Sequence, residues 1–249
     1  MQIWYNHIDL RKSILVNVSN KKGRVHLSKF IKKYKHAWVL LYFFIYAPWF
    51  LYLEKTVTVN YHSVHIKLDD YIPFNELFVI PYYIWFGFIA VIVGYLLFAD
   101  KKEFYRSTAF LFIGMTVCLF IYTVWPNGQD LRPDLAAMGR DNIFIDIVRN
   151  LYRTDTSTNV CPSIHAFNSI GVCIAVFHTN SLNNKRYITI PTVIVAALIC
   201  MSTVFLKQHS VFDVICAGLL ASVLYLVVYV PDYVKILESK KARVKSTIS

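Results

Sequence analysis

The sequence predicts an all-α integral membrane protein, a bundle of six transmembrane helices, from its composition and from the lengths of its apolar runs. Of its 249 residues, 56% are hydrophobic and 16% are aromatic, which is more apolar than soluble domains usually are. Apolar runs of about 17–25 residues are long enough to cross a bilayer. Six such runs occur, at roughly 37–53, 77–98, 108–125, 163–179, 187–206 and 210–230. The fourth is the least regular, because His165, Asn168 and Ser169 interrupt it.

The basic residues predict how the chain is oriented and divided. If both termini are cytoplasmic, 19 of the 26 Lys and Arg residues fall on the cytoplasmic side, which agrees with the positive-inside rule. We therefore expect a basic cytoplasmic N-terminal segment at 1–36, a membrane domain at 37–230 and a basic cytoplasmic tail at 231–249. The long polar loops 54–76 and 126–162 then lie on the extracytoplasmic side.

The net charge of +11 predicts contact with anionic lipid headgroups. It does not predict nucleic-acid binding, because membrane spans separate the basic residues and no single basic face results. The expected partners are therefore the lipid bilayer and a membrane lipid, with no nucleic acid. The sequence leaves the oligomeric state open.

The cysteines and carboxylates predict neither a metal nor another cofactor. Four of the five cysteines lie inside apolar runs, and none has metal-ligand spacing. Cys161 alone lies in a polar loop, and the sequence leaves its role open. No group of carboxylates accompanies the polar clusters described below to hold Mg²⁺ or Ca²⁺.

The two long loops are expected to contain local structure. In the first, TVTVNY and VHIKL alternate apolar and polar residues with a change of phase near His62, which predicts a small hairpin. In the second, residues 142–153 have helical periodicity. One face carries Asp146, Arg149, Asn150 and Arg153, and the other carries Ile143, Ile147, Val148 and Leu151. This pattern predicts an amphipathic helix that lies in the membrane interface.

Three polar clusters fall on the extracytoplasmic side: NGQDLRPD at 127–134, NVCPSIH at 159–165 and LKQHSVFD at 206–213. In the last, the four-residue spacing of His209 and Asp213 would stack them on one face of a helix. A carboxylate that holds one imidazole nitrogen fixes the tautomer and leaves the lone pair of the other nitrogen available to a nucleophile or base. The alternative is an ion pair that only tethers the start of a helix.

The second cluster predicts the start of a helix that can bind an anion. Pro162 suits a first helical turn, where its missing N–H is harmless. A helix N-terminus presents free N–H groups to an anion, Ser163 adds a hydroxyl, and His165 lies in the same turn. The alternative is a capped helix with an incidental histidine.

Two cations complete this group. Arg132 lies in the long loop, and Lys207 precedes His209 by two residues. A lone arginine in a polar loop is usually solvated, but the planar guanidinium also suits a phosphate. Two histidines, two cations and a helix N-terminus at a membrane surface fit phosphoryl transfer on a lipid phosphate through a covalent phospho-histidine.

The three clusters resemble the signatures of the type-2 phosphatidic acid phosphatase (lipid phosphate phosphatase) superfamily, which are KxxxxxxRP, PSGH and SRxxxxxHxxxD. Here they read WPNGQDLRP at 125–133, PSIH at 162–165 and STVFLKQHSVFD at 202–213. Their order and the expected six-span layout extend the resemblance over roughly residues 37–230.

The resemblance implies a role for each matching residue. It implies that His209 is the nucleophile, that Asp213 orients it, and that His165 protonates the leaving oxygen. It also implies that Arg132 and Ser163 bind the substrate phosphate.

Three positions depart from the family signatures. Trp125 and Thr203 stand where the family has Lys and Arg, and Ile164 replaces Gly. We expect Lys207 to replace one of the missing phosphate-binding cations. The run FLKQH resembles the branch with bacterial relatives of inositol phosphorylceramide synthases, and we expect a bacterial plasma membrane. The topology predicted from the basic residues places the active site at the extracytoplasmic face of that membrane.

The expected function is metal-independent hydrolysis of a lipid phosphate, phosphatidate-like or an isoprenoid diphosphate, by a phosphoric monoester hydrolase. The alternative is a phosphotransferase that moves a headgroup phosphate to an alcohol, as inositol phosphorylceramide synthases do. A transporter or a catalytically inactive binding protein is a third reading, which the complete set of two histidines and an aspartate disfavours.

Overall fold

The computed structural model describes residues 32–231. Most of the basic N-terminal segment predicted at 1–36, and all of the tail predicted at 231–249 except its first residue, lie outside the described residues. The chain divides into a small unit that ends at Leu40 and a large unit that begins at Leu41. Everything that positions the polar clusters belongs to the large unit.

The described chain is mostly helical, which confirms the all-α prediction. Five helical segments are long and apolar enough to cross a membrane: Lys35–Thr56, Glu76–Ala99, Lys101–Val124, Arg186–Phe205 and Val211–Val228. They consist of η1 (Lys35–Tyr42) with α2 (Phe43–Thr56), η2 (Glu76–Phe78) with α4 (Val79–Ala99), α5 (Lys101–Val124), α8 (Arg186–Phe205) and α9 (Val211–Val228). The chain is therefore an integral membrane protein.

The predicted fourth span is shorter than the other five. It forms α7 (Ile164–His178), which has 15 residues. At about 1.5 Å per residue this helix is about 22 Å long, less than the hydrocarbon core of about 30 Å. A sixth full-length span is thus not confirmed.

The place of α7 in the bundle explains its composition. It packs against α4, α5, α8 and α9, so protein rather than lipid covers most of its surface. Asn168 and Ser169, which interrupt the apolar run in the sequence, are both buried in these contacts. The hydroxyl of Ser169 is satisfied inside the helix, because it donates to the carbonyl oxygen of His165 at 2.8 Å.

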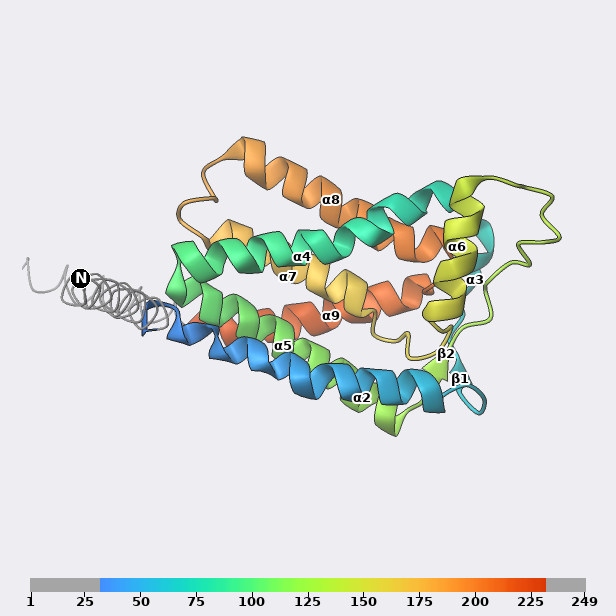
Figure 1. Cartoon of the computed structure of the whole chain (residues 1–249), viewed down its shortest axis with the longest axis horizontal. Helices are drawn as coiled ribbons and strands as arrows, with labels where there is room; N and C mark the ends of the chain where they lie inside the picture. The colour runs from blue at the N-terminus through green and yellow to red at the C-terminus, as the bar shows by residue number, and fades with distance from the viewer. Residues whose placement is uncertain (1–31, 232–249) are drawn as a thin grey trace, which may run out of the picture. The chain divides into compact units, whose positions relative to one another are not determined.

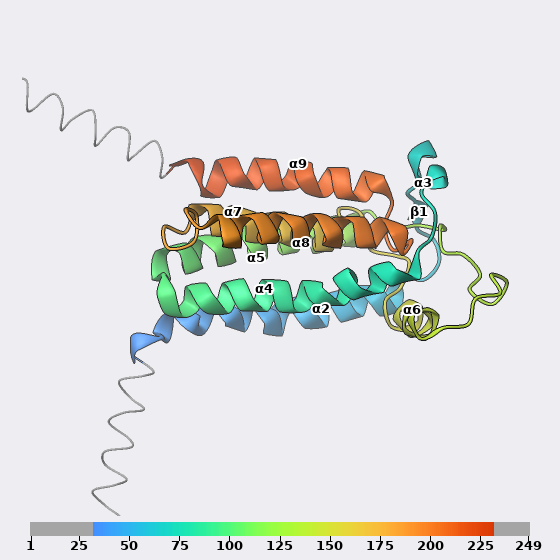
Figure 2. The same ribbon diagram turned by 90° about the horizontal axis from the view of Figure 1, so that it is seen from above.

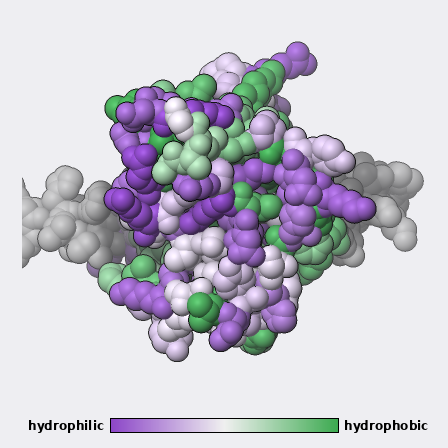
Figure 3. Space-filling model, turned by 90° about the vertical axis from the view of Figure 1, so that its right-hand side faces the viewer, coloured by the Kyte–Doolittle hydropathy of each residue, from purple (hydrophilic) through white to green (hydrophobic). Residues whose placement is uncertain are grey.

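The long helices run along one common axis, and the polar loops gather at one end of it. Figure 1 shows α2, α4, α5, α7, α8 and α9 extending in this direction, with α3 (Lys67–Tyr71), α6 (Ile143–Thr154) and both strands at the right-hand end. Figure 2, seen from above, shows α3, α6 and β1 at the same end. Viewed from there, hydrophilic side chains cover much of the surface (Figure 3). All three polar clusters lie in segments that end or begin at this face.

The hairpin predicted in the first long loop is wrong. The strand β1 (His62–Ser63) pairs in parallel with β2 (Asn127–Gly128) from the other long loop. His62 N donates to the Pro126 carbonyl at 2.8 Å, and Val64 N donates to the Gly128 carbonyl at 2.7 Å. The alternation in TVTVNY could not reveal a partner more than 60 residues away, and the chain continues into α3 instead of turning back.

The amphipathic helix predicted at 142–153 is present as α6, which runs across the end of the bundle (Figure 1). Asn142 is its N-cap and accepts from the N–H groups of Phe144 and Ile145 at 3.0 Å. The predicted apolar face needs one correction. Ile143 is exposed and Ile145 is buried. Residues two positions apart in an α-helix point about 200° away from each other around its axis, so these two cannot share a face.

Close packing between α5 and α7 fixes the position of α7. The ring of Phe167 stacks on that of Phe110 with centroids 5.0 Å apart. The same ring lies over Gly114, where an added Cβ would come within 2.0 Å of its Cζ atom. A second glycine, Gly171, lets α7 approach Leu111 in the same way, with 2.7 Å to its Cδ2 atom. The packing of α5 against α7 therefore requires glycine, which has no Cβ, at both positions.

We predict that Gly114→Ala lowers the stability of the protein, because the new methyl group must displace the Phe167 ring. Overpacking of this kind usually costs about 1–3 kcal/mol. The check is the thermal unfolding midpoint of purified protein in detergent. Gly94→Ala in α4 is the matched control, since nothing lies within 4 Å of a Cβ there. Equal midpoints for the two variants would contradict this packing.

Candidate active site

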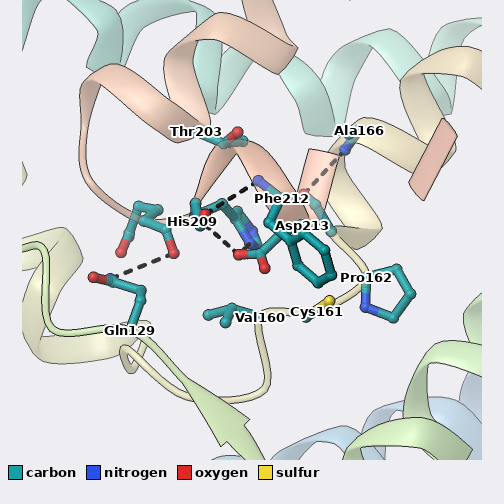
Figure 4. Close-up of polar contacts among 12 residues, drawn as sticks. Gln129, Val160, Cys161, Pro162, Ala166, Thr203, His209, Phe212 and Asp213 are labelled. Carbon is teal, nitrogen blue, oxygen red and sulfur yellow. Dashed lines mark hydrogen bonds and ion pairs between the residues drawn. The ribbon is translucent and has the colours of Figure 1, made fainter. Parts of the chain in front are cut away.

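His209 and Asp213 meet at the start of α9. Ser210 is the N-cap of this helix, and its hydroxyl accepts from Phe212 N at 3.1 Å. Asp213 Oδ2 accepts from Ser210 N at 2.9 Å and faces His209 Nδ1 at 3.3 Å. His209 therefore lies just before the helix, not on its face as the spacing predicted. The contact itself is present, and Figure 4 shows the two side chains against one another.

Both members of the His209–Asp213 pair are buried. His209 is 6% exposed and Asp213 is fully buried. With a proton on Nδ1, the imidazole donates to the carboxylate, and the lone pair of Nε2 is left for another partner. A buried carboxylate also stabilises any positive charge that forms on the ring.

The ring of His165, in the first turn of α7, faces the ring of His209. Their centroids are 5.6 Å apart and the planes are steeply inclined. On its other sides, His165 contacts the rings of Tyr82 and Trp85 from α4, at 4.6 Å and 4.3 Å. The sequence did not indicate these two aromatic residues, because they lie within an apolar run and look like ordinary lipid-facing or core residues.

Ser163 is the N-cap of α7, and Pro162 lies before the cap rather than in the first turn as predicted. The Ser163 hydroxyl accepts from Ala166 N at 3.3 Å. Its backbone N–H donates to the Asp213 carbonyl at 3.1 Å, which ties the start of α7 to the start of α9. The first N–H groups of a helix have no acceptor within it, so this terminus presents free donors close to the two histidines.

Arg132 is engaged with the protein rather than solvated. Its Nη1 donates to the carbonyl of Tyr152 at 3.2 Å, and its Nη2 donates at 2.8 Å to the carbonyls of Asp155 and Thr156. The Gln208 side-chain oxygen also accepts from Nη2, and the guanidinium lies over the Tyr152 ring. Burial lowers the pKa of Arg132 from its usual value. Within the described chain, Nε alone of its nitrogens is buried without a partner.

Lys207 points toward the first long loop. Its Nζ donates to the Asp69 carbonyl at 2.8 Å, and its backbone has a positive φ of 52°. Burial lowers the pKa of Lys207, and the carboxylates of Asp69 and Asp70 oppose this shift. One of its three ammonium donors is used in this contact, so two remain for an anion.

The two positions that lack the family cations have other contacts. The Trp125 ring stacks on His62 at a centroid distance of 5.7 Å. Thr203 is buried, and its carbonyl accepts from the backbone N–H groups of Gln208 and His209 at 2.9 Å and 3.0 Å. Thr203 thus shapes the turn before His209, and neither position supplies a cation.

Two buried amides, which the sequence placed in a cluster without assigning them a role, hold the loops of the site together. Asn127 Oδ1 accepts from the N–H groups of Val160 and Cys161 at 2.9 Å and 2.8 Å. Gln129 Nε2 donates to the Lys207 carbonyl at 2.7 Å. Both side chains are fully buried. The one sequence feature that could have indicated this role was their position inside the polar cluster 127–134.

Glu54 at the end of α2 holds the segment that enters α7. Its Oε2 accepts from Thr156 N at 3.1 Å and from the Thr156 hydroxyl at 2.6 Å, and its Oε1 accepts from Asn159 Nδ2 at 3.0 Å. A single carboxylate at the end of an apolar run gave no sequence signal for this role.

Cys161, whose role the sequence left open, is a buried packing residue. It is 3% exposed and lies beside Asp213, as Figure 4 shows. Burial, together with the charge of Asp213, raises the pKa of the Cys161 thiol. A thiol that stays protonated is a poor nucleophile.

The arrangement brings four of the six predicted residues into one continuous group: His209, Asp213, His165 and Ser163. Arg132 reaches this group through Gln208, and Lys207 borders it with its ammonium turned toward Asp69. Among residues 32–231, no three or more His, Cys, Asp or Glu side chains gather in a way that could hold a metal ion.

Comparison with known protein families places the same residues in one match. The family model of the PAP2 superfamily matches residues 128–235, a range that includes Arg132 and the whole of the second and third signatures. No curated protein and no solved structure matches the chain. Over residues 128–235, the family match confirms the resemblance that the sequence clusters indicated.

Proposed function

Because residues 128–235 match the family model of the PAP2 superfamily, we propose that this membrane protein transfers the phosphoryl group of a lipid phosphate through His209 to water. The observation that carries the proposal is the buried His209–Asp213 pair with the ring of His165 facing it. A nucleophile, the group that orients it and an acid at one helix junction are the parts that such a reaction needs.

The first step is attack of His209 Nε2 on phosphorus. The P–N bond forms as the bond from phosphorus to the lipid oxygen breaks, and protonated His165 gives its proton to that leaving oxygen. Asp213 keeps the proton on Nδ1 and stabilises the positive charge that develops on the ring. In the second step, neutral His165 takes a proton from water, the water oxygen attacks phosphorus, and the P–N bond breaks to release phosphate.

The donors around the two histidines would hold the phosphate oxygens. The hydroxyl hydrogen of Ser163 and the free N–H groups at the start of α7 suit an anion. Arg132 would contribute its unpartnered Nε–H, and Lys207 its two remaining ammonium donors. These assignments keep the phosphate-binding roles predicted from the sequence, with specific atoms for each.

The site would face the extracytoplasmic side, with both termini in the cytoplasm. The support is the distribution of basic residues, 19 of 26 of which fall on the other side of the predicted topology. The polar end that holds the site (Figure 3) and α6 lying across it then meet the headgroup region of the bilayer.

Transfer to an alcohol is the second candidate, and the scarcity of cations favours it. Trp125 and Thr203 bring no positive charge, and Arg132 and Lys207 are partly engaged by carbonyl groups. A phosphate monoester carries about 1.5–2 negative charges near neutral pH, whereas a phosphodiester carries one. A phosphodiester lipid as donor would need fewer cations, and its headgroup phosphate would pass from His209 to a hydroxyl.

A phosphate-release assay with purified protein tests the function directly. The substrates are phosphatidate and an isoprenoid diphosphate, each with and without EDTA, and a phosphodiester lipid with an added alcohol acceptor. We expect turnover of at least one lipid phosphate, unchanged by EDTA, since within residues 32–231 no group of three or more His, Cys, Asp or Glu side chains could hold a metal ion. Activity that is lost in EDTA and restored by Mg²⁺ would contradict the mechanism. Turnover of the phosphodiester alone, dependent on the alcohol, would establish the second candidate.

A comparison of leaving groups separates the roles of the two histidines. We predict that His209→Ala abolishes turnover of every substrate, whereas His165→Ala loses about 10²–10⁴-fold on a lipid phosphate and much less on p-nitrophenyl phosphate. The reason is that p-nitrophenolate leaves without a proton and a lipid alkoxide does not. The measurement is kcat/KM for both substrates. Equal losses on both substrates in His165→Ala, with turnover retained in His209→Ala, would show that the roles are wrong.

A further inference from the structure

A carboxylate from the first long loop reaches the turn that carries His209. Asp69 lies in α3, between α2 and α4 in the sequence, and is fully buried. Its neighbour Asp70 is exposed and pairs with His65 at 2.7 Å on the surface. Two adjacent aspartates thus have opposite environments, and only one of them contacts the catalytic turn.

The contacts of Asp69 lie on both sides of His209. Its Oδ2 accepts from the Ser210 hydroxyl at 2.6 Å, and its Oδ1 accepts from Val211 N at 2.8 Å. On the other side of the histidine, the Asp69 carbonyl accepts from Lys207 Nζ at 2.8 Å. One residue therefore anchors the positions before and after the nucleophile.

The turn needs such an anchor because its backbone is strained. Lys207 has a φ of 52°. Residues other than glycine seldom adopt this backbone conformation unless their surroundings hold them in it. Thr203 near the end of α8 and Gln129 in the second long loop restrain the turn. Asp69 restrains it from α3, and its carboxylate also satisfies a first-turn N–H of α9 that has no acceptor within the helix.

A short chain of hydrogen bonds connects Asp69 to the imidazole. Ser210 donates its hydroxyl to Asp69 and its backbone N–H to Asp213 Oδ2. The same Asp213 oxygen faces His209 Nδ1. A displacement of Ser210 would therefore move the Asp213 carboxylate that orients the imidazole. It would also move the backbone of His209, the preceding residue.

We propose that Asp69 is a positioning residue for His209, which acts through Ser210 and sets the direction of attack of Nε2. The inference rests on the proposed function, since it concerns the same phosphoryl transfer. Asp69 touches neither the substrate phosphate nor the leaving oxygen in this role. Asp69 holds the Lys207 ammonium through its backbone carbonyl, which a side-chain substitution retains. Loss of the carboxylate should therefore lower the rate of the chemical step for every leaving group and leave substrate binding unchanged.

The test measures kcat and KM of Asp69→Ala and Asp69→Asn on a lipid phosphate and on p-nitrophenyl phosphate. A nucleophile misplaced by about 1 Å loses about 100-fold in rate, and we expect a fall of this order in kcat for Asp69→Ala on both substrates, with KM unchanged. Asp69→Asn retains one acceptor oxygen and should fall less. Asp70→Ala is the matched control, with the same charge change one residue away, and should behave as wild type.

Coupling to Ser210 distinguishes positioning from a general loss of structure. If Asp69 acts through the Ser210 hydroxyl, Ser210→Ala and Asp69→Ala together should cost little more than the larger single loss. Additive losses, or a kcat of both Asp69 variants equal to that of wild type, would overturn the inference. If Asp69→Ala does not fold, as judged by its unfolding midpoint in detergent, Asp69→Asn carries the same test.

The outcome also separates this inference from the proposed function. A wild-type protein that turns over none of the phosphates would refute the proposed function itself. A wild-type protein that is active, with Asp69 variants that are equally active, would refute only the role of Asp69.

Discussion

The carboxylate and carbonyl of Asp213 align the three parts of the site. One carboxylate oxygen accepts from Ser210 N and faces His209 Nδ1, while the carbonyl accepts from Ser163 N. One residue thus sets the ring of His209, the start of α9 and the start of α7, which carries His165. A charge this deeply buried needs partners in its surroundings. Ser210 N and His209 Nδ1 supply them at Oδ2, whereas Oδ1 is buried without a hydrogen-bond partner among residues 32–231.

The membrane adds a second constraint, since backbone polar groups near hydrocarbon need partners within the protein. At the polar end of the bundle, side chains supply these partners and connect segments that are far apart in the sequence. Asn127 holds residues 160 and 161, Gln129 holds the carbonyl of Lys207, and Glu54 holds Thr156 and Asn159. These contacts give the irregular loops around the histidines a defined shape without regular secondary structure.

Local patterns in the sequence were sufficient for the long helices and for the contact between His209 and Asp213. Apolar length predicted the long spans, and the periodicity of 142–153 predicted α6. The spacing of His209 and Asp213 predicted their contact, although it placed both inside the helix, because a spacing of four cannot tell a helix face from an N-terminal cap. A helix start was also predicted here, with Pro162 in the first turn, whereas Ser163 is the N-cap and the helix begins at Ile164.

Features that depend on distant partners could not be predicted in this way. The pairing of β1 with β2 and the contacts of Asp69 and Glu54 join segments that are 60 or more residues apart. Tyr82 and Trp85 look like any other aromatic residues of an apolar span, and only the fold brings them against His165. The central position of α7 likewise follows from packing with four other helices, which its own sequence does not encode.

The central claim is that His209 becomes covalently bound to phosphorus. The most direct measurement is rapid quenching of the wild-type protein in alkali during turnover of a ³²P-labelled lipid phosphate, followed by peptide mapping. Phosphohistidine is stable in alkali and labile in acid, so the account predicts alkali-stable label on the peptide that contains His209, and none in His209→Ala. Label on another residue, or equal labelling of the His209→Ala protein, would contradict it.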